Sequence, residues 1–200
     1  DALWDINGNA KSPKTDFHYW GEPLFGYYNS TDEWVMRKHI EMLTQAGVDF
    51  LVFDTTNGFT YDTVWKKLLK LLNEYLEAGW DVPKIVFYTN AYSTQKVIEI
   101  YNSCYKKNYY PNTWYRPNGD KPMIIGYTDP AKDTEVSYNA PKIPQEILDF
   151  FEFWEPQWPN KPYKSNGFPW MEWSYPQPEH NGVINVSVAQ HPQLPFSASY

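Results

Sequence analysis

The segment VDFLVFD, residues 48–54, is a mostly apolar run that ends on a carboxylate. A short apolar run of this kind is typical of a parallel strand that is buried on both faces. The residues before it follow a helical pattern, and Gly47 ends that helix. Ser30 or Thr31 is expected to cap the helix, because Ser30 and Glu33 have capping-box spacing. The apolar stripe predicts an inward face made of Trp34, Val35, Ile40 and Leu43.

The same alternation of helix and strand continues along the chain. Helical patterns cover about 61–78, 93–107 and 144–148, and strands are predicted at 84–89, 122–127, 149–154, 168–173 and 183–189. Such alternation predicts an α/β fold with a parallel sheet and right-handed crossovers. Neither a dinucleotide-binding glycine motif nor a phosphate-binding loop motif occurs, so nucleotide-binding folds lose support.

The number of strands bears on whether the sheet closes. Six strands are predicted, which is fewer than the eight of a complete (β/α)8 TIM-type barrel. We expect a single domain over residues 1–200, built as an incomplete barrel that is truncated at both ends. An open six-stranded sheet is the alternative.

Composition and charge exclude several classes of function. The net charge of -7 argues against a nucleic-acid partner, because phosphate contacts need clustered Lys and Arg. Cys104 is the one cysteine, so no intrachain disulfide forms, and its helical pattern predicts an inert core position. No apolar stretch is long enough to span a bilayer. The four histidines lack metal-ligand spacing, so no metal is expected. We also expect no cofactor, and we expect a monomer.

Aromatic residues make up 19% of the chain, with ten Trp and seventeen Tyr. Both side chains combine a flat apolar face with a polar edge, a combination that suits the C–H faces and hydroxyls of sugars. Several Trp lie in polar, Pro-rich segments, which favours surface positions for at least some of them. The alternative is a core that is merely rich in aromatic residues.

Polar and aromatic side chains follow the predicted strands at their carboxyl ends, where the active site of a barrel lies. The residues expected to bind substrate there are Asn57, Tyr88, Asn90, Trp154, Glu155, Trp170, Trp173, Gln190 and His191. The strand interiors are apolar whereas the strand ends are polar or aromatic, and this difference is typical of a cleft at the strand ends. The alternative is that these strands simply lead into polar loops.

Carboxylates at these strand ends are candidates for acid–base chemistry, since glycoside hydrolysis usually needs two of them. Asp54 and Glu172 are the best placed, whereas Glu155 and Asp129 are weaker candidates. The tryptophans beside Glu172 could raise its pKa by desolvation. Asp54 could instead cap the following turn, and either carboxylate could bind a sugar hydroxyl. Asp133, in a mid-chain loop, is expected to tolerate substitution better than Glu172.

The stretch from Tyr28 to Asn57 joins a helix, a glycine stop and a strand end in fixed register. It resembles glycoside hydrolase family 71/99-like proteins of bacteria, which are related to endo-α-mannosidases and α-1,3-glucanases. Residues 170–177 and 186–190 also look like that group. The resemblance implies a (β/α)8 barrel that acts on glycans.

The resemblance also implies a Trp- and Glu-rich catalytic segment late in the barrel, and nothing after Gln190 matches one. The principal catalytic pair is then expected beyond Tyr200. In that case the strand-end residues are mainly subsite ligands, namely Asp54, Asn57, Asn90, Glu172 and Gln190.

Three functions are compatible with these patterns. The first is a glycoside hydrolase, secreted, periplasmic or at the cell surface, that acts on an oligosaccharide or polysaccharide. The second is a non-catalytic carbohydrate-binding protein on a degenerate barrel, which the aromatic content supports equally. The third is a metabolic α/β enzyme with a small substrate, which would carry a phosphate or cofactor motif that the sequence lacks.

Overall fold

A computed structural model describes residues 22–133, 139–158, 161–170 and 178–186 of the chain. Helices and strands alternate through most of this part, as the sequence predicts. The helices are α1 (Glu33–Gln45), α2 (Asp62–Glu77), α3 (Ser93–Ile100) and α4 (Gln145–Phe150). The strands are β1 (Phe50–Thr55), β2 (Lys84–Thr89), β3 (Met123–Ile125), β4 (Glu152–Gln157), β5 (Gly167–Pro169), β6 (Glu179–His180) and β7 (Val183–Ile184).

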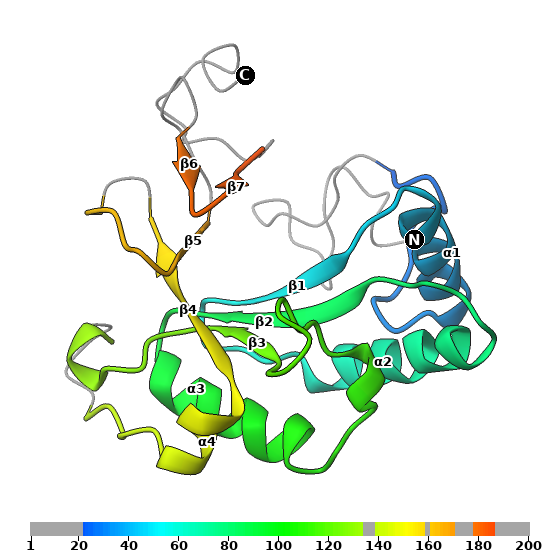
Figure 1. Ribbon diagram of the computed structural model, residues 1–200. Helices are drawn as coiled ribbons and strands as arrows, with labels where there is room; N and C mark the ends of the chain where they lie inside the picture. Colours follow the sequence, from blue (N-terminus) through cyan, green and yellow to red (C-terminus); the bar gives the residue numbers. More distant parts are fainter. Residues whose placement is uncertain (1–21, 134–138, 159–160, 171–177, 187–200) are drawn as a thin grey trace, which may run out of the picture.

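The first five strands form one parallel sheet in the order β1-β2-β3-β4-β5 (Figure 1). The sheet curls, and α1, α2, α3 and α4 all contribute side chains to the core on one of its faces. A doubly wound sheet would have helices on both faces. The described residues therefore form a curled, half-barrel α/β sheet, in line with the predicted incomplete barrel.

The prediction that a sixth strand joins the parallel sheet is wrong. The structure places Val183–Ile184 in a hairpin, where it runs antiparallel to Glu179–His180 and does not extend the parallel sheet. Asn181 and Gly182 form the turn, both with positive φ angles, as is usual for a two-residue hairpin loop. Figure 1 shows the hairpin near β5, on the side of the sheet opposite to α2, α3 and α4.

The start of α1 differs from the prediction. Asp32, and neither Ser30 nor Thr31, caps the helix, because its carboxylate accepts a hydrogen bond from the Val35 amide at 3.1 Å. Trp34 was expected to face the core, but 57% of it is exposed, and its ring meets the edge of Phe25. Val35 and Ile40 are buried as predicted.

The boundary between α4 and β4 also differs. The prediction ends the helix at 148 and the strand at 154, whereas α4 continues to Phe150 and β4 extends to Gln157. Apolar residues run through both elements, and such a run does not distinguish a helical turn from a strand. Trp154 and Glu155 therefore lie in the middle of β4, so the prediction that they end a strand is wrong.

The two faces of the sheet carry separate apolar clusters. Alternate residues of a strand point to opposite faces, so Phe87 packs among the helices whereas Val86 and Tyr88 lie on the other face. We call the first the helix-covered face and the second the open face. Cys104 is buried on the helix-covered face, and burial raises the pKa of its thiol to about 12, in line with the predicted inert role.

The second and third helices bury residues on their inner faces. Helical spacing predicts inward positions for Leu71 and Leu72 in α2 and for Val97 in α3, and all three are fully buried. Past Ile100 the predicted helix continues as one π-helical turn, Tyr101–Tyr105. Within the described residues, no helix combines the length and the apolar character that crossing a bilayer requires.

Candidate functional site

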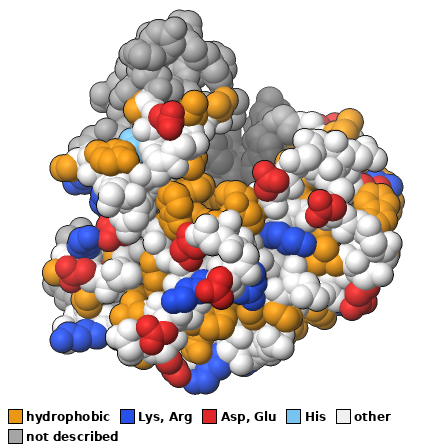
Figure 2. All heavy atoms as spheres, in the orientation of Figure 1, with side chains coloured by type: hydrophobic (Ala, Val, Ile, Leu, Met, Phe, Trp, Pro, Cys, Tyr) orange, Lys and Arg blue, Asp and Glu red, His pale blue; other side chains and the backbone are white. Residues whose placement is uncertain are grey.

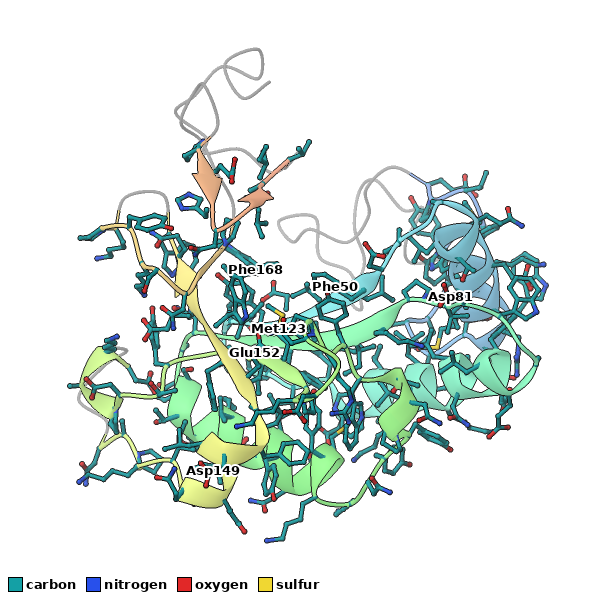
Figure 3. The ribbon with its side chains drawn as sticks, viewed as in Figure 1. Phe50, Asp81, Met123, Asp149, Glu152 and Phe168 are labelled. Atoms are coloured by element: carbon teal, nitrogen blue, oxygen red, sulfur yellow. The ribbon has the colours of Figure 1, made fainter. Side chains whose placement is uncertain are left out.

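The carboxyl ends of β1 to β5 bring aromatic and polar side chains to the open face. The strand register pairs Asp54 with Tyr88 and Tyr88 with Ile125, so these residues share one face. Figure 3 shows Phe50, Met123 and Phe168 on the same face, where no helix of the described part packs. Figure 2 shows hydrophobic side chains gathered over this part of the surface. We define the open face at the strand ends as the candidate site.

Three aromatic rings pack together at the site, with Trp158 and Trp170 partly exposed and Tyr88 buried beside them. The ring centroids of Tyr88 and Trp170 are 5.1 Å apart, and those of Trp170 and Trp158 are 5.9 Å apart. The Tyr88 hydroxyl donates a hydrogen bond of 3.0 Å to the Phe168 carbonyl, which ties β2 to β5 across the sheet. Burial raises the pKa of Tyr88 far above its usual range, so this side chain stays protonated and acts as a donor.

A pocket of about 410 Å³ lies against this aromatic surface. Tyr88 and Trp170 form part of its wall, and the rest comes from β1, β5 and the hairpin, namely Val52, Phe168, Pro169, Val183, Ile184, Asn185 and Val186. The Asn185 amide donates to the Trp170 carbonyl and thereby fixes the segment after β7 beside β5. The volume falls within the range of roughly 300–1,000 Å³ that is usual for small-molecule sites.

Asn90 lies just after β2 and joins two other strand ends through its side chain. Its Oδ1 accepts hydrogen bonds from the Tyr127 hydroxyl at 3.3 Å and from Trp158 Nε1 at 3.2 Å. Tyr127 follows β3, and Trp158 follows β4. The amino group of Lys164 lies 4.8 Å from the centre of the Tyr127 ring. Polar groups from three strands thus meet next to the aromatic surface.

Asp54, one of the two predicted catalytic residues, lies exposed at the end of β1. Its Oδ1 accepts hydrogen bonds from the Thr56 amide at 3.0 Å and from the Thr56 hydroxyl at 2.7 Å. Asp54 therefore caps the turn after β1, which is the alternative role that the sequence suggests. Its second carboxylate oxygen makes no hydrogen bond within the described residues. Asn57 is also exposed, two residues beyond the strand.

Glu155 lies on the helix-covered side of β4, because it has the same orientation along the strand as Phe153. Its carboxylate forms ion pairs with Lys132 at 2.7 Å and with Lys164 at 3.3 Å. The side chain is almost fully buried, so these ion pairs compensate its charge. The predicted place of Glu155 in the cleft is therefore wrong. Trp154 does face the open side, but further from the carboxyl end, where its indole N–H donates to Glu152.

Two other carboxylates have structural roles. Asp133 was expected in a tolerant loop, yet it is buried and accepts hydrogen bonds from both the amide and the hydroxyl of Thr94 in the first turn of α3. Asp129 accepts from the Ala131 amide and so begins a short 3-10 helix. Asp133 is thus unsuitable as a neutral comparison for a catalytic carboxylate.

Several predicted site residues lie outside the described part of the chain. These are Glu172, Trp173, Gln190 and His191. Among the predicted residues that are described, the structure brings Asp54, Tyr88, Asn90 and Trp170 to the open face at the strand ends.

The sequence interpretation missed two residues of the site, Trp158 and Tyr127. Trp158 was missed because β4 was predicted to end before it, and the strand in fact reaches Gln157. Tyr127 ends the predicted strand 122–127, but its contacts with Asn90 and Lys164 form only in three dimensions, so no local pattern marks it as a site residue. The pair Gln157–Trp158, directly before a proline, was the available signal for a later strand end.

No group of three or more metal-ligating side chains gathers anywhere in the described ranges. Comparison of the chain with protein-family models, with curated proteins and with solved structures gives no match. The site must therefore be interpreted from its own geometry. Flat aromatic faces that lie beside hydrogen-bonding groups from several strands are suited to a ligand with both apolar and hydroxylated surfaces.

Proposed function

We propose that the protein binds a glycan on the open face at the strand ends and hydrolyses one of its O-glycosidic bonds. The observation that supports this most is the pair of partly exposed indoles, Trp158 and Trp170, whose ring centroids lie 5.9 Å apart beside the buried Tyr88. A pyranose ring offers C–H faces that pack on such rings, and its hydroxyls reach the polar groups around them. The resemblance of Tyr28 to Asn57 to family 71/99-like hydrolases favours the same class.

The proposed chemistry uses Asp54 and Glu172 as the two carboxyl groups. Asp54 is exposed at the end of β1 and has one oxygen that no described group occupies. Glu172 lies outside the described residues, and in the sequence it follows Trp170, which lines the pocket, by two positions. One group would protonate the leaving oxygen, and the other would act as nucleophile or base. The identity of the sugar, the type of linkage and the closure of the sheet into a TIM-type barrel are parts of the same proposal.

Binding is tested with the full chain and soluble oligosaccharides from α-mannan and α-1,3-glucan, by isothermal titration calorimetry. Trp170→Ala is expected to weaken binding about tenfold or more, because a central aromatic contact commonly contributes over ~1.4 kcal/mol. Trp80→Ala is the matched control, since Trp80 is partly exposed beyond the end of α2 and does not line the pocket. Equal affinities in the two variants would contradict the proposed binding surface.

Hydrolysis is tested by the release of reducing ends from the same two polysaccharides. Glu172→Gln and Asp54→Asn are each expected to lower the rate about 10²–10⁴-fold, the usual contribution of an acid–base group. Glu146→Gln is the control, because Glu146 lies exposed on α4, in the helix layer. An unchanged rate in both site variants would remove these carboxylates from the reaction.

The second candidate function is glycan binding without hydrolysis. It is favoured by one observation: Asp54, Asp129 and Glu155 all have structural partners within the described residues. Binding that is sensitive to Trp170→Ala, with no release of reducing ends, would support this candidate over the hydrolase.

A further inference from the structure

The orientation of the Asn90 amide is fixed by the chemistry of its neighbours. One atom of this amide lies 3.2 Å from Trp158 Nε1 and 3.3 Å from the Tyr127 hydroxyl. An indole N–H only donates, so the atom facing Trp158 must be the amide oxygen. Side-chain amides usually have an ambiguous orientation, and here the donor-only indole removes that ambiguity.

The amide nitrogen of Asn90 consequently points away from Trp158 and presents two N–H donors. It donates to no group within the described residues, and the atom keeps some solvent exposure. Asn181 offers a contrast, because its amide nitrogen donates to the carbonyls of Lys164 and Gly167. The Asn181 amide thus holds the fold together, whereas the donors of Asn90 remain accessible to a ligand.

The position of Asn90 places these donors beside the aromatic surface. The Trp158 ring that orients Asn90 lies 5.9 Å from Trp170, which lines the pocket. A ligand that packs on both indoles would therefore have its edge within reach of the Asn90 amide. Trp158 would then have two roles, as a packing surface and as the group that orients the donor.

The charges nearby favour a neutral ligand. The ammonium group of Lys164 is already paired with Glu155 at 3.3 Å and donates to the Pro156 carbonyl at 2.8 Å. Asp54 adds an exposed carboxylate at the same edge of the sheet, and it would repel an acidic sugar. The acceptor that Asn90 meets is then best supplied by hydroxyl oxygens.

We propose that Asn90 is a specificity-determining donor that binds hydroxyl oxygens of a neutral pyranose ring packed on Trp158 and Trp170. This inference rests on the proposed glycan function and deepens it, because it names the ligand class and the group that selects it. It also makes Trp158 a positioning residue for Asn90.

The first test is Asn90→Asp in the full chain, titrated with soluble α-mannan and α-1,3-glucan oligosaccharides. The carboxylate keeps an oxygen for Tyr127 and Trp158, so the melting temperature should stay unchanged. Both donors are lost, so the affinity should fall about tenfold. A sugar hydroxyl could turn its proton toward the carboxylate, but it would then lose the acceptor to which it otherwise donates. An affinity within about twofold of the wild type, at an unchanged melting temperature, would overturn the inference.

The second test compares Trp158→Phe with Trp170→Phe. Both changes remove the same ring area, but only the first removes the N–H that orients Asn90. Each variant is also combined with Asn90→Asp. Trp158→Phe should couple to Asn90→Asp, so that the double variant binds better than the product of the single losses predicts. Trp170→Phe should show no such coupling.

The outcomes separate this inference from the proposed function. A wild-type chain that binds neither oligosaccharide removes both. A wild-type chain that binds, with Asn90→Asp binding equally well, removes the inference alone. Equal coupling of both tryptophans to Asn90 would show that Trp158 acts only as a packing surface, and it would overturn the positioning role.

Discussion

The helix-covered face and the open face of the same sheet differ in what packs on them. On the helix-covered face, Ile85, Phe87 and Ile124 are all 0% exposed, beneath side chains from four helices. On the open face, Val86 and Ile125 are equally buried and Tyr88 is 1% exposed, whereas Val52 of β1 is 38% exposed and lines a pocket with Tyr88 and Trp170. Both faces are apolar, so hydrophobicity alone does not distinguish a core from a binding surface.

The open face thus combines buried strand positions with an apolar edge that the described residues leave partly exposed. Apolar area that helices cover on folding contributes about 25 cal/mol per Å² to stability. Apolar area that stays open contributes less to stability and remains available to a ligand. The open face also carries the strand ends, where Asn90 and Trp158 add polar edges to the apolar floor. Substitutions on the two faces should therefore have different consequences, which makes the comparison testable.

The largest effect is expected for Trp65→Ala in α2. Trp65 is 1% exposed, and its ring meets the edges of Phe87 and Tyr109 on the helix-covered face. Its removal leaves a large cavity, so the free energy of unfolding should fall by about 3–5 kcal/mol. Urea unfolding followed by circular dichroism measures this loss. A loss below ~1 kcal/mol would mean that the helix layer does not anchor the fold.

Much of this helix-covered face was predictable from the sequence, because it depends on local patterns. Periodicity places Leu71, Leu72 and Val97 inward, and glycine marks the ends of the first two helices. Element boundaries were less predictable, since the apolar run across α4 and β4 suits either structure. Capping of α1 by Asp32 was missed because Ser30, Thr31 and Asp32 are all good capping residues and lie side by side.

A smaller effect is expected for Glu155→Gln, which tests the ion pairs that Glu155 forms with Lys132 and Lys164 on the helix-covered side of β4. Glu155 is almost fully buried and pairs with Lys132 and Lys164. Removing one partner of a buried pair is costly, but both lysines keep some contact with solvent, so we expect a loss of about 2 kcal/mol. Glu33→Gln breaks an exposed pair with Arg37, which solvent screens, and should leave the free energy of unfolding almost unchanged. Equal losses would show that burial does not set the strength of these pairs.

The candidate site was less predictable than the core, because its geometry depends on where strands end and on contacts between distant segments. Strand-end position was enough to select Asp54, Tyr88 and Asn90, whereas Trp170 was selected as a neighbour of Glu172 inside the predicted strand 168–173. It failed for Glu155, since β4 continues past the predicted end and Glu155 lies inside the strand, on the face opposite to Trp154. The link between Asn90 and Trp158 spans 68 residues, and no local pattern predicts it.

The smallest effect is expected for Val52→Ala on the open face, compared with Val97→Ala on the helix-covered face. Val97 is fully buried, so losing two methyl groups there should cost about 2 kcal/mol, including the cavity that remains. Val52 is partly exposed and borders the pocket, so the same change should cost only about 0.5–1 kcal/mol. Thermal and urea unfolding of the two variants measure both losses. A Val52→Ala loss as large as that of Val97→Ala would mean that the open face is part of the stabilising core, and the pocket would then be a packing defect and not a place for a ligand.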